Sequence, residues 1–207
     1  MPWPVTHVLI AEKFYPRYFK HLNRKEFILG NCFPDIRYPA RIERDRTHIK
    51  NIPLSTIQSA TAFRAGVLFH SMVDGLWNKH VHHHAERLFS ELPHDQPMIH
   101  TAKILQDKFI YAKSDHWDQI AASFSTILPE EHTYGASEAM VERWHAMLAH
   151  YLSKPPELKD LNMLALSLAP DMLDKISEYC LAYQENPTLK DIMVRFYEHV
   201  ETLIVDS

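Results

Sequence analysis

Glycine and cysteine are scarce in this sequence, and long apolar runs are absent. Its 207 residues include 4 Gly and 2 Cys. So few glycines disfavour glycine-rich phosphate loops and β folds with many tight turns. Two cysteines are too few for a disulfide framework and favour a reducing compartment. No apolar run approaches the roughly 20 residues that cross a bilayer, and the first residues lack a secretory signal pattern. The sequence therefore predicts a cytoplasmic protein with no transmembrane segment.

Positive charge is also in short supply, whereas histidine is abundant. The 22 Lys and Arg residues are outnumbered by 26 Asp and Glu, which gives a formal net charge of −4 at pH 7. This balance lacks the basic surface that grips duplex nucleic acid. Hydrophobic residues make up 46% and charged residues 23%, as in a globular chain with a core. The 15 His residues are an excess that metal chemistry can use.

Apolar residues recur at helical spacing almost throughout the chain, and alternating strand patterns are absent. We expect Thr6 to cap a first helix and Gly30 to end a second one. A long helix is expected from Ser55 past Trp77. Further helices should start at or near Pro97, Asp115, Ser137, Leu158, Asp171 and Pro187. Because no repeat or flexible linker divides the sequence, we predict one all-α domain over residues 1–207.

A polar pair in the long predicted helix is the strongest chemical signal. His70 and Asp74 are four residues apart on an apolar stripe, so both side chains point to the same side. A buried carboxylate without partners costs several kcal/mol, so Asp74 must be paired, protonated or bound to a metal. Gly66 lies one turn before His70 and costs the helix about 1 kcal/mol relative to Ala, which indicates close packing there. A His–Asp hydrogen bond within a helical core is the alternative interpretation.

Three further polar residues lie beside apolar neighbours earlier in the chain. Asp35 follows Phe-Pro, His48 precedes Ile49, and His7 precedes Val-Leu. Two imidazoles and two carboxylates suffice for a four-coordinate divalent metal site, and zinc accepts both kinds of ligand. We therefore expect a metal site built mainly from residues 6–86.

Short motifs in this stretch follow a defined order. They are Gly-Asn-Cys-Phe-Pro-Asp at residues 30–35, Thr-His at 47–48, and Gly-Val-Leu-Phe-His-Ser-Met-Val-Asp at 66–74. With an N-terminal histidine, this order resembles the zinc-dependent phospholipase C family, which is related to the zinc-dependent single-strand nucleases. The resemblance covers roughly residues 6–80. It implies a multi-helix bundle of the phospholipase C/nuclease type that holds one to three zinc ions.

The resemblance also implies roles for individual side chains. The implied metal ligands are His7, Asp35, His48, His70, Asp74 and His80. Four of them would bind a first zinc ion, namely Asp35, His48, His70 and Asp74. His7 would join Asp74 at a second ion, and His80 would serve the remaining one. Asp35 would in addition orient or deprotonate the attacking water. Other divalent transition metals suit the same donors.

The activity implied by the resemblance is metal-dependent hydrolysis of a phosphoric ester, either a small molecule or a phospholipid head group. Residues that contact choline in the bacterial enzymes of this family have no match here, so the substrate does not carry over. Two alternatives remain. One is a catalytically degenerate relative in which a structural metal supports a binding or interaction protein, because the third zinc site is matched only incompletely. The other is a single-strand nuclease that uses the same metals.

Overall fold

The computed structural model describes residues 3–157, 160 and 168–205, which form helices and connecting segments without a β-strand. The all-α prediction is confirmed for these residues, and none of their helices combines the length and apolar content needed to cross a bilayer. The helices are α1 (Pro4–Phe14), α2 (Arg24–Cys32), α3 (Arg37–Ala40), α4 (Arg44–Thr47), α5 (Leu54–Gln58), α6 (Ala62–His83), α7 (Ala85–Phe89), α8 (Gln96–Ile110), α9 (Trp117–Ser123), α10 (Pro129–His132), α11 (Glu138–Leu152), α13 (Pro170–Tyr183) and α14 (Pro187–Val205).

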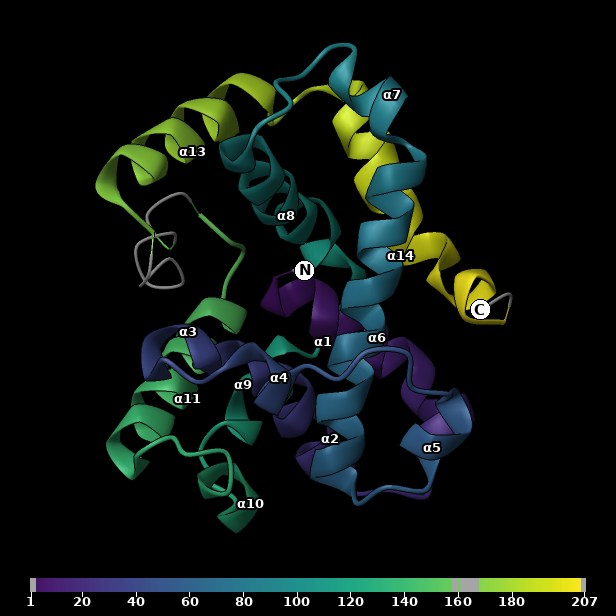
Figure 1. Ribbon diagram of the computed structural model, residues 1–207, viewed down its shortest axis with the longest axis vertical. Helices are drawn as coiled ribbons and strands as arrows, with labels where there is room; N and C mark the ends of the chain where they lie inside the picture. The colour runs from purple at the N-terminus through teal and green to yellow at the C-terminus, as the bar shows by residue number, and fades with distance from the viewer. Residues whose placement is uncertain (1–2, 158–159, 161–167, 206–207) are drawn as a thin grey trace.

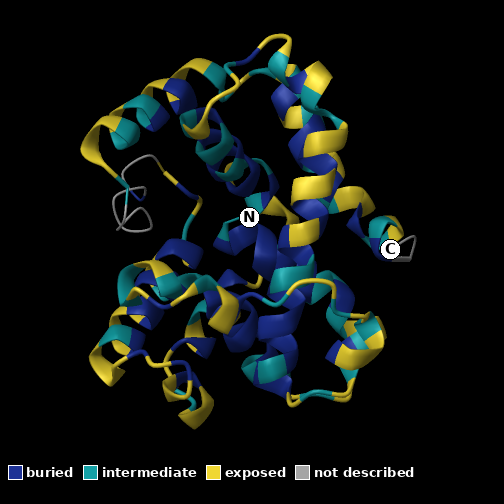
Figure 2. Cartoon of the chain, in the orientation of Figure 1, coloured by how far each residue is buried: buried dark blue, intermediate teal, exposed yellow. Residues whose placement is uncertain are grey.

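Helix α6 runs through the middle of the molecule, and other helices pack around it (Figure 1). It makes its most extensive contact with α2, and α1, α5 and α14 also pack against it. Helix α8 contacts α13 and α14, whereas α9 joins α11 to α2. Buried positions concentrate on α1 and on the half of α6 near α2, and exposed positions mark the outer helices (Figure 2). The core is therefore centred on α1, α2 and α6.

Two glycines allow α2 and α6 to approach each other closely. A Cβ atom at Gly66 would lie 2.2 Å from the Phe27 carbonyl oxygen, and one at Gly30 would lie 2.0 Å from the Phe63 carbonyl oxygen. The close packing expected at Gly66 is confirmed. The expectation that Gly30 ends its helix was wrong, because α2 continues to Cys32. A glycine that permits a helix crossing and one that ends a helix look alike in a sequence.

Other helix boundaries also differ from expectation. Helix α1 begins at Pro4 with Trp3 as its N-cap, so Thr6 lies in the first turn and does not cap the helix. The long helix α6 starts at Ala62, because a break separates it from the short helix α5. Helices α8, α9, α11, α13 and α14 begin within about two residues of the positions expected for them. The helix expected at Leu158 lies outside the described residues.

The α2–α6 crossing predicts opposite effects for two Gly→Ala substitutions on α6. Gly66→Ala should lower the free energy of unfolding by about 1–3 kcal/mol, because its Cβ meets rigid backbone atoms of α2. Gly75→Ala should raise it by up to about 1 kcal/mol, because no atom lies within 4 Å of that Cβ and alanine favours the helix. Chemical denaturation measures both changes. A Gly66→Ala variant as stable as the wild type would contradict this account of the crossing.

Candidate metal centre

His70 projects from α6 and is held in one tautomer by α2. Its Nδ1 atom lies 2.8 Å from the Asn31 carbonyl oxygen. A carbonyl oxygen accepts hydrogen bonds and cannot donate them, so Nδ1 carries the proton and Nε2 keeps its lone pair. Metal-binding histidines are typically oriented in this way by an acceptor on the other ring nitrogen. The α2–α6 crossing thus orients His70 as a metal ligand would need to be oriented.

His48 reaches the same place from the chain after α4. The Thr47 hydroxyl lies 3.3 Å from the Arg44 carbonyl oxygen, to which it donates, and 2.8 Å from His48 Nδ1. In the tautomer in which Nδ1–H donates to this hydroxyl, His48 Nε2 is unprotonated and carries the lone pair that a metal ligand needs. This nitrogen lies 3.3 Å from Asp74 Oδ2. The Thr-His pair in the sequence thus places a candidate ligand beside a hydroxyl group that can support it.

Asp35 enters from the short 3₁₀ turn Pro34–Ile36, which follows α2 almost directly. Its Oδ1 atom lies 3.9 Å from both His48 Nε2 and His70 Nε2. The Asp35 side chain keeps 19% of its surface accessible, compared with 1–3% for those of His48, His70 and Asp74. Asp35 is thus the group in this cluster that solvent or a small molecule reaches most easily.

His7 approaches from α1 on the other side of Asp74. Its ring stacks on that of His70, with centroids 3.9 Å apart and an interplanar angle of 7°. His7 Nε2 lies 3.3 Å from Asp74 Oδ1, whereas His48 and His70 face the other carboxylate oxygen. The two oxygens of Asp74 therefore face two different sets of nitrogen atoms.

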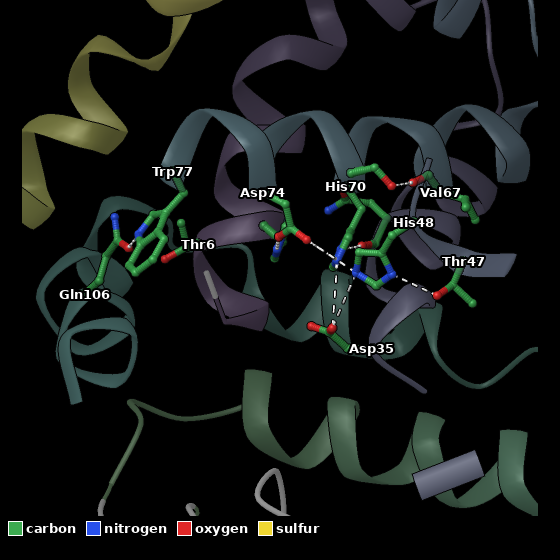
Figure 3. Close-up of polar contacts among 12 residues, drawn as sticks. Thr6, Asp35, Thr47, His48, Val67, His70, Asp74, Trp77 and Gln106 are labelled. Atoms are coloured by element: carbon green, nitrogen blue, oxygen red, sulfur yellow. Dashed lines mark hydrogen bonds and ion pairs between the residues drawn. The ribbon is translucent and has the colours of Figure 1, made fainter. Parts of the chain in front are cut away.

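These residues form two overlapping groups with the dimensions of a metal site, and Figure 3 shows how Asp35, His48, His70 and Asp74 face one another. Asp35, His48 and His70 each place one donor atom within 4.8 Å of the others, and so do His7, His70 and Asp74. Zinc–ligand bonds of 2.0–2.2 Å place tetrahedral donors about 3.3–3.6 Å apart. Among the four ligands expected for the first ion, the distances from a carboxylate oxygen of Asp35 or Asp74 to Nε2 of His48 or His70 run from 3.3 to 3.9 Å. These four carboxylate–imidazole distances are equal to or slightly longer than those of a closed tetrahedral shell, and Asp74 joins His70 in the second group of donors and not in the first.

Buried polar atoms without hydrogen bonds are concentrated in this cluster. They include both ring nitrogens of His7, Nε2 of His70, Oδ1 of Asp35 and both oxygens of Asp74. A buried polar atom left without a partner costs about 1–3 kcal/mol, and more when the group is charged. So many unsatisfied donor atoms that face one another form a group that could hold a metal ion.

A second buried histidine shows what an ordinary His–carboxylate pair looks like in the same chain. His145 Nε2 lies 2.7 Å from Glu131 Oε2, and His145 Nδ1 lies 3.1 Å from the Phe124 carbonyl oxygen. The other Glu131 oxygen accepts a hydrogen bond from the Leu128 amide at 2.7 Å. This pair is complete without a metal. The alternative interpretation of His70 and Asp74 as a simple core hydrogen bond predicts such saturation, which the cluster lacks.

The protonation states in the cluster suit metal ligands. Burial, with repulsion from His70, lowers the pKa of His7 to about 4, and burial also lowers the pKa of His48. Burial by itself would raise the pKa of Asp74, but the neighbouring His70, His48 and His7 hold it well below its usual range. At neutral pH the two imidazoles are neutral and Asp74 is ionised, which are the forms that bind metals.

The structure does not bring His80 into either group. His80 Nε2 lies 2.9 Å from the Ile192 carbonyl oxygen and donates to it, so this nitrogen anchors α6 to α14. His80 therefore lies apart from the other five expected ligands, and its role at a remaining zinc ion stays a prediction. Its spacing of six residues after Asp74 places it on a different side of the helix, because six residues are not a whole number of turns.

Asp107 supports the cluster from α8 and was not anticipated from the sequence. Its buried carboxylate accepts from the Val5 amide at 2.9 Å, from the Thr6 amide at 2.8 Å and from the Thr6 hydroxyl at 2.6 Å. The Tyr151 hydroxyl lies 3.2 Å away. Burial raises the pKa of Asp107 to about 7, although these donors oppose the rise. The carboxylate fixes the first turn of α1, which carries His7. The feature of the sequence that could have identified Asp107 is an acidic residue among apolar residues at helical spacing.

Comparisons of this chain with protein-family models, with curated proteins and with solved structures found no match. The properties of the site therefore rest on its own residues.

Metal content tests the cluster directly. We expect His70→Ala and Asp74→Asn each to abolish stoichiometric binding of divalent metal. His70 belongs to both groups of donors, and Asp74 belongs to one group and contacts His48 of the other. The matched control is His116→Ala, which removes an exposed histidine beside Asp115. Elemental analysis of untagged protein after dialysis gives the number of metals per chain. Full metal content in either cluster variant would place the site elsewhere.

The hydrogen bonds of Asp107 predict that a substitution outside the candidate metal ligands lowers the stability of the fold. Asp107→Asn turns an amide NH₂ toward backbone donors of α1, so it should lower the free energy of unfolding by about 1–3 kcal/mol. Asp115→Asn changes an exposed acid in the same way and should stay within about 0.5 kcal/mol of the wild type. Chemical denaturation compares the two. Equal stability of both variants would show that Asp107 does not hold α1.

Proposed function

We propose that this protein is a metal-dependent phosphoric ester hydrolase that resembles phospholipase C and uses zinc. The observation that carries the proposal is the convergence of His7, Asp35, His48, His70 and Asp74, whose donor atoms are buried, close together and largely without hydrogen bonds. Few functions other than metal binding account for such an arrangement. The order of these residues in the sequence is the order that the phospholipase C resemblance implies.

The donor set fits zinc better than magnesium or calcium. Imidazole nitrogens suit zinc, whereas hard cations such as Mg²⁺ prefer oxygen ligands. Asp35, His48, His70 and Asp74 would hold a first ion, and His7 with Asp74 Oδ1 would contribute to a second. When bound, zinc supplies Lewis acidity and lowers the pKa of water from 15.7 to about 7. That chemistry is suited to phosphoric esters at neutral pH.

Asp35 is the residue that we assign to handling the attacking water. Its carboxylate is the most accessible acid of the cluster, and its Oδ1 lies next to His48 and His70. A carboxylate in this position can orient a water molecule and accept its proton. His70 contacts the Asn31 carbonyl and His48 contacts the Thr47 hydroxyl, so both rings keep a fixed orientation while the substrate is hydrolysed. The chain thus supplies positioning as well as ligands.

One observation favours a structural metal as the second candidate. Asp35, His48, His70 and Asp74 together amount to four protein ligands, and a closed four-ligand zinc site is typical of structural zinc. Catalytic zinc usually has three protein ligands and an open position. The position of His7 beside Asp74 Oδ1 argues for further metal, because a single closed site does not use it. The number of metals per chain therefore distinguishes the two candidates.

Hydrolysis is the direct test of the proposal. Protein that holds two or more zinc ions should cleave bis(p-nitrophenyl) phosphate, and chelation should stop the reaction. Asp35→Asn should lower kcat by at least about 100-fold, within the range expected for loss of a general base. His116→Ala serves as the control. One metal per chain without cleavage of monoesters, diesters or phospholipids would favour the structural metal.

Metal removal should also destabilise the fold. A ligand that binds only the folded state contributes about 4 kcal/mol at a thousand-fold excess over its Kd. Asp35 and His48 flank the short helices α3 and α4, so the metal would cross-link this segment to α6. Chelation should lower the Tm, and limited proteolysis of the metal-free protein should begin between residues 37 and 50. Protection of this segment without metal would contradict the cross-link.

A further inference from the structure

A pocket of about 750 Å³ opens beside the metal cluster and reaches two of its residues. It lies between α6 and the segment 48–54, with Ile204 of α14 at its edge, and both His48 and Asp74 line it. The segment that follows α4 crosses α6 here (Figure 1). The volume falls within the range of about 300–1,000 Å³ that is typical of small-molecule sites. Asp74, whose two oxygens are buried and lack hydrogen bonds, is one of its lining residues.

The pocket is positively charged in a protein that is negatively charged overall. Arg44, Lys50 and Lys79 line it, and Asp74 is the single acid among its described lining residues. Arg44 Nη2 lies 3.7 Å from Asp74 Oδ2, next to the metal cluster. Lys50 and Lys79 are exposed and make no ion pair with an acid in the described part of the chain. Three cations around one small pocket attract anions.

The remaining walls of the pocket are apolar or open. Ile49, Ile52, Leu54 and Leu76 provide apolar surface. Gly75 lies in the interior of α6 directly after Asp74, and a Cβ at this position would meet no atom within 4 Å. Packing therefore does not account for this glycine, although glycine costs a helix about 1 kcal/mol relative to Ala. The missing side chain keeps the surface beside Asp74 open.

We propose that this pocket binds the organic part of the substrate, and that the substrate is an anionic phosphoric ester with an apolar group. The proposal rests on the proposed function, because it assigns the phosphoryl group to the metal cluster. Arg44 lies where it can pair with a phosphoryl oxygen through its guanidinium fork. Lys50 and Lys79 attract the negative charge of the phosphoryl group, and the apolar walls hold the hydrocarbon groups of the organic part. A quaternary ammonium group, as in choline, is disfavoured by the same three cations.

Two phosphorus compounds of opposite character test this preference by calorimetric titration of the zinc-loaded protein. Phenylphosphonate joins an anionic head to an apolar ring and lacks a cleavable ester bond. Phosphorylcholine joins a phosphate to a quaternary ammonium group. We expect phenylphosphonate to bind the wild-type protein at least about tenfold more tightly, because only phosphorylcholine carries a cation into the pocket.

Two sets of variants locate the binding site. Lys50→Glu combined with Lys79→Glu should weaken phenylphosphonate binding by at least about tenfold and reduce the preference over phosphorylcholine. The charge-matched control combines Lys20→Glu with Lys175→Glu, which lie outside the pocket lining. Gly75→Trp should weaken both ligands by filling the pocket, whereas Ala182→Trp adds the same ring at an exposed position of another helix. Metal content and Tm are measured for every variant.

The outcomes separate this inference from the proposed function. Unchanged phenylphosphonate affinity in the lysine variant and in Gly75→Trp would overturn the pocket assignment, even if the protein hydrolyses phosphoric esters. Tighter binding of phosphorylcholine than of phenylphosphonate by the wild type would overturn the charge preference. If the variants behave as expected but no ester is cleaved, the pocket is an anion-binding site and the proposed hydrolysis fails.

Discussion

The close crossing of α2 and α6 is the constraint on which the candidate site depends. Gly30 and Gly66 bring the two backbones together at a distance that any Cβ would prevent. This approach places the Asn31 carbonyl within 2.8 Å of His70 Nδ1 and thereby sets the tautomer of that ring. It also directs the chain that leaves α2 toward α6, so Asp35 lies opposite His70. The packing of the two helices and the orientation of the candidate ligands His70 and Asp35 thus depend on one contact.

Desolvation gives the cluster its chemical character. Burial keeps His7 and His48 neutral, while the surrounding imidazoles keep Asp74 ionised. A cluster of this kind is costly in the absence of a cation, because its donor atoms have lost water and gained few hydrogen bonds. The saturated His145–Glu131 pair shows that this chain can bury a histidine and an acid without that cost. Fold stability and metal binding are therefore expected to be coupled in this protein.

The sign of the charge changes over a short distance between this cluster and the adjoining pocket. The cluster contributes two carboxylates, whereas the adjoining pocket carries Arg44, Lys50 and Lys79. Bound metal would reverse the sign of the cluster, so that metal and pocket would together form one positive region. The net charge of the chain gives no indication of this, because a global sum does not resolve local fields. An anionic ester would interact favourably with both parts.

The sequence by itself determined the helical class, the four-residue spacing that places His70 and Asp74 on one buried face, and the close packing at Gly66. These features depend on local periodicity, which a sequence displays directly. The sequence could not place His80, because a spacing that resembles a family pattern does not say which neighbour the side chain meets. It also gave no role to Asp107, whose hydrogen bonds reach Val5 and Thr6 on a helix far away in the chain. Tertiary structure decided these contacts, because the free energy of a buried polar group depends on partners that only packing brings near.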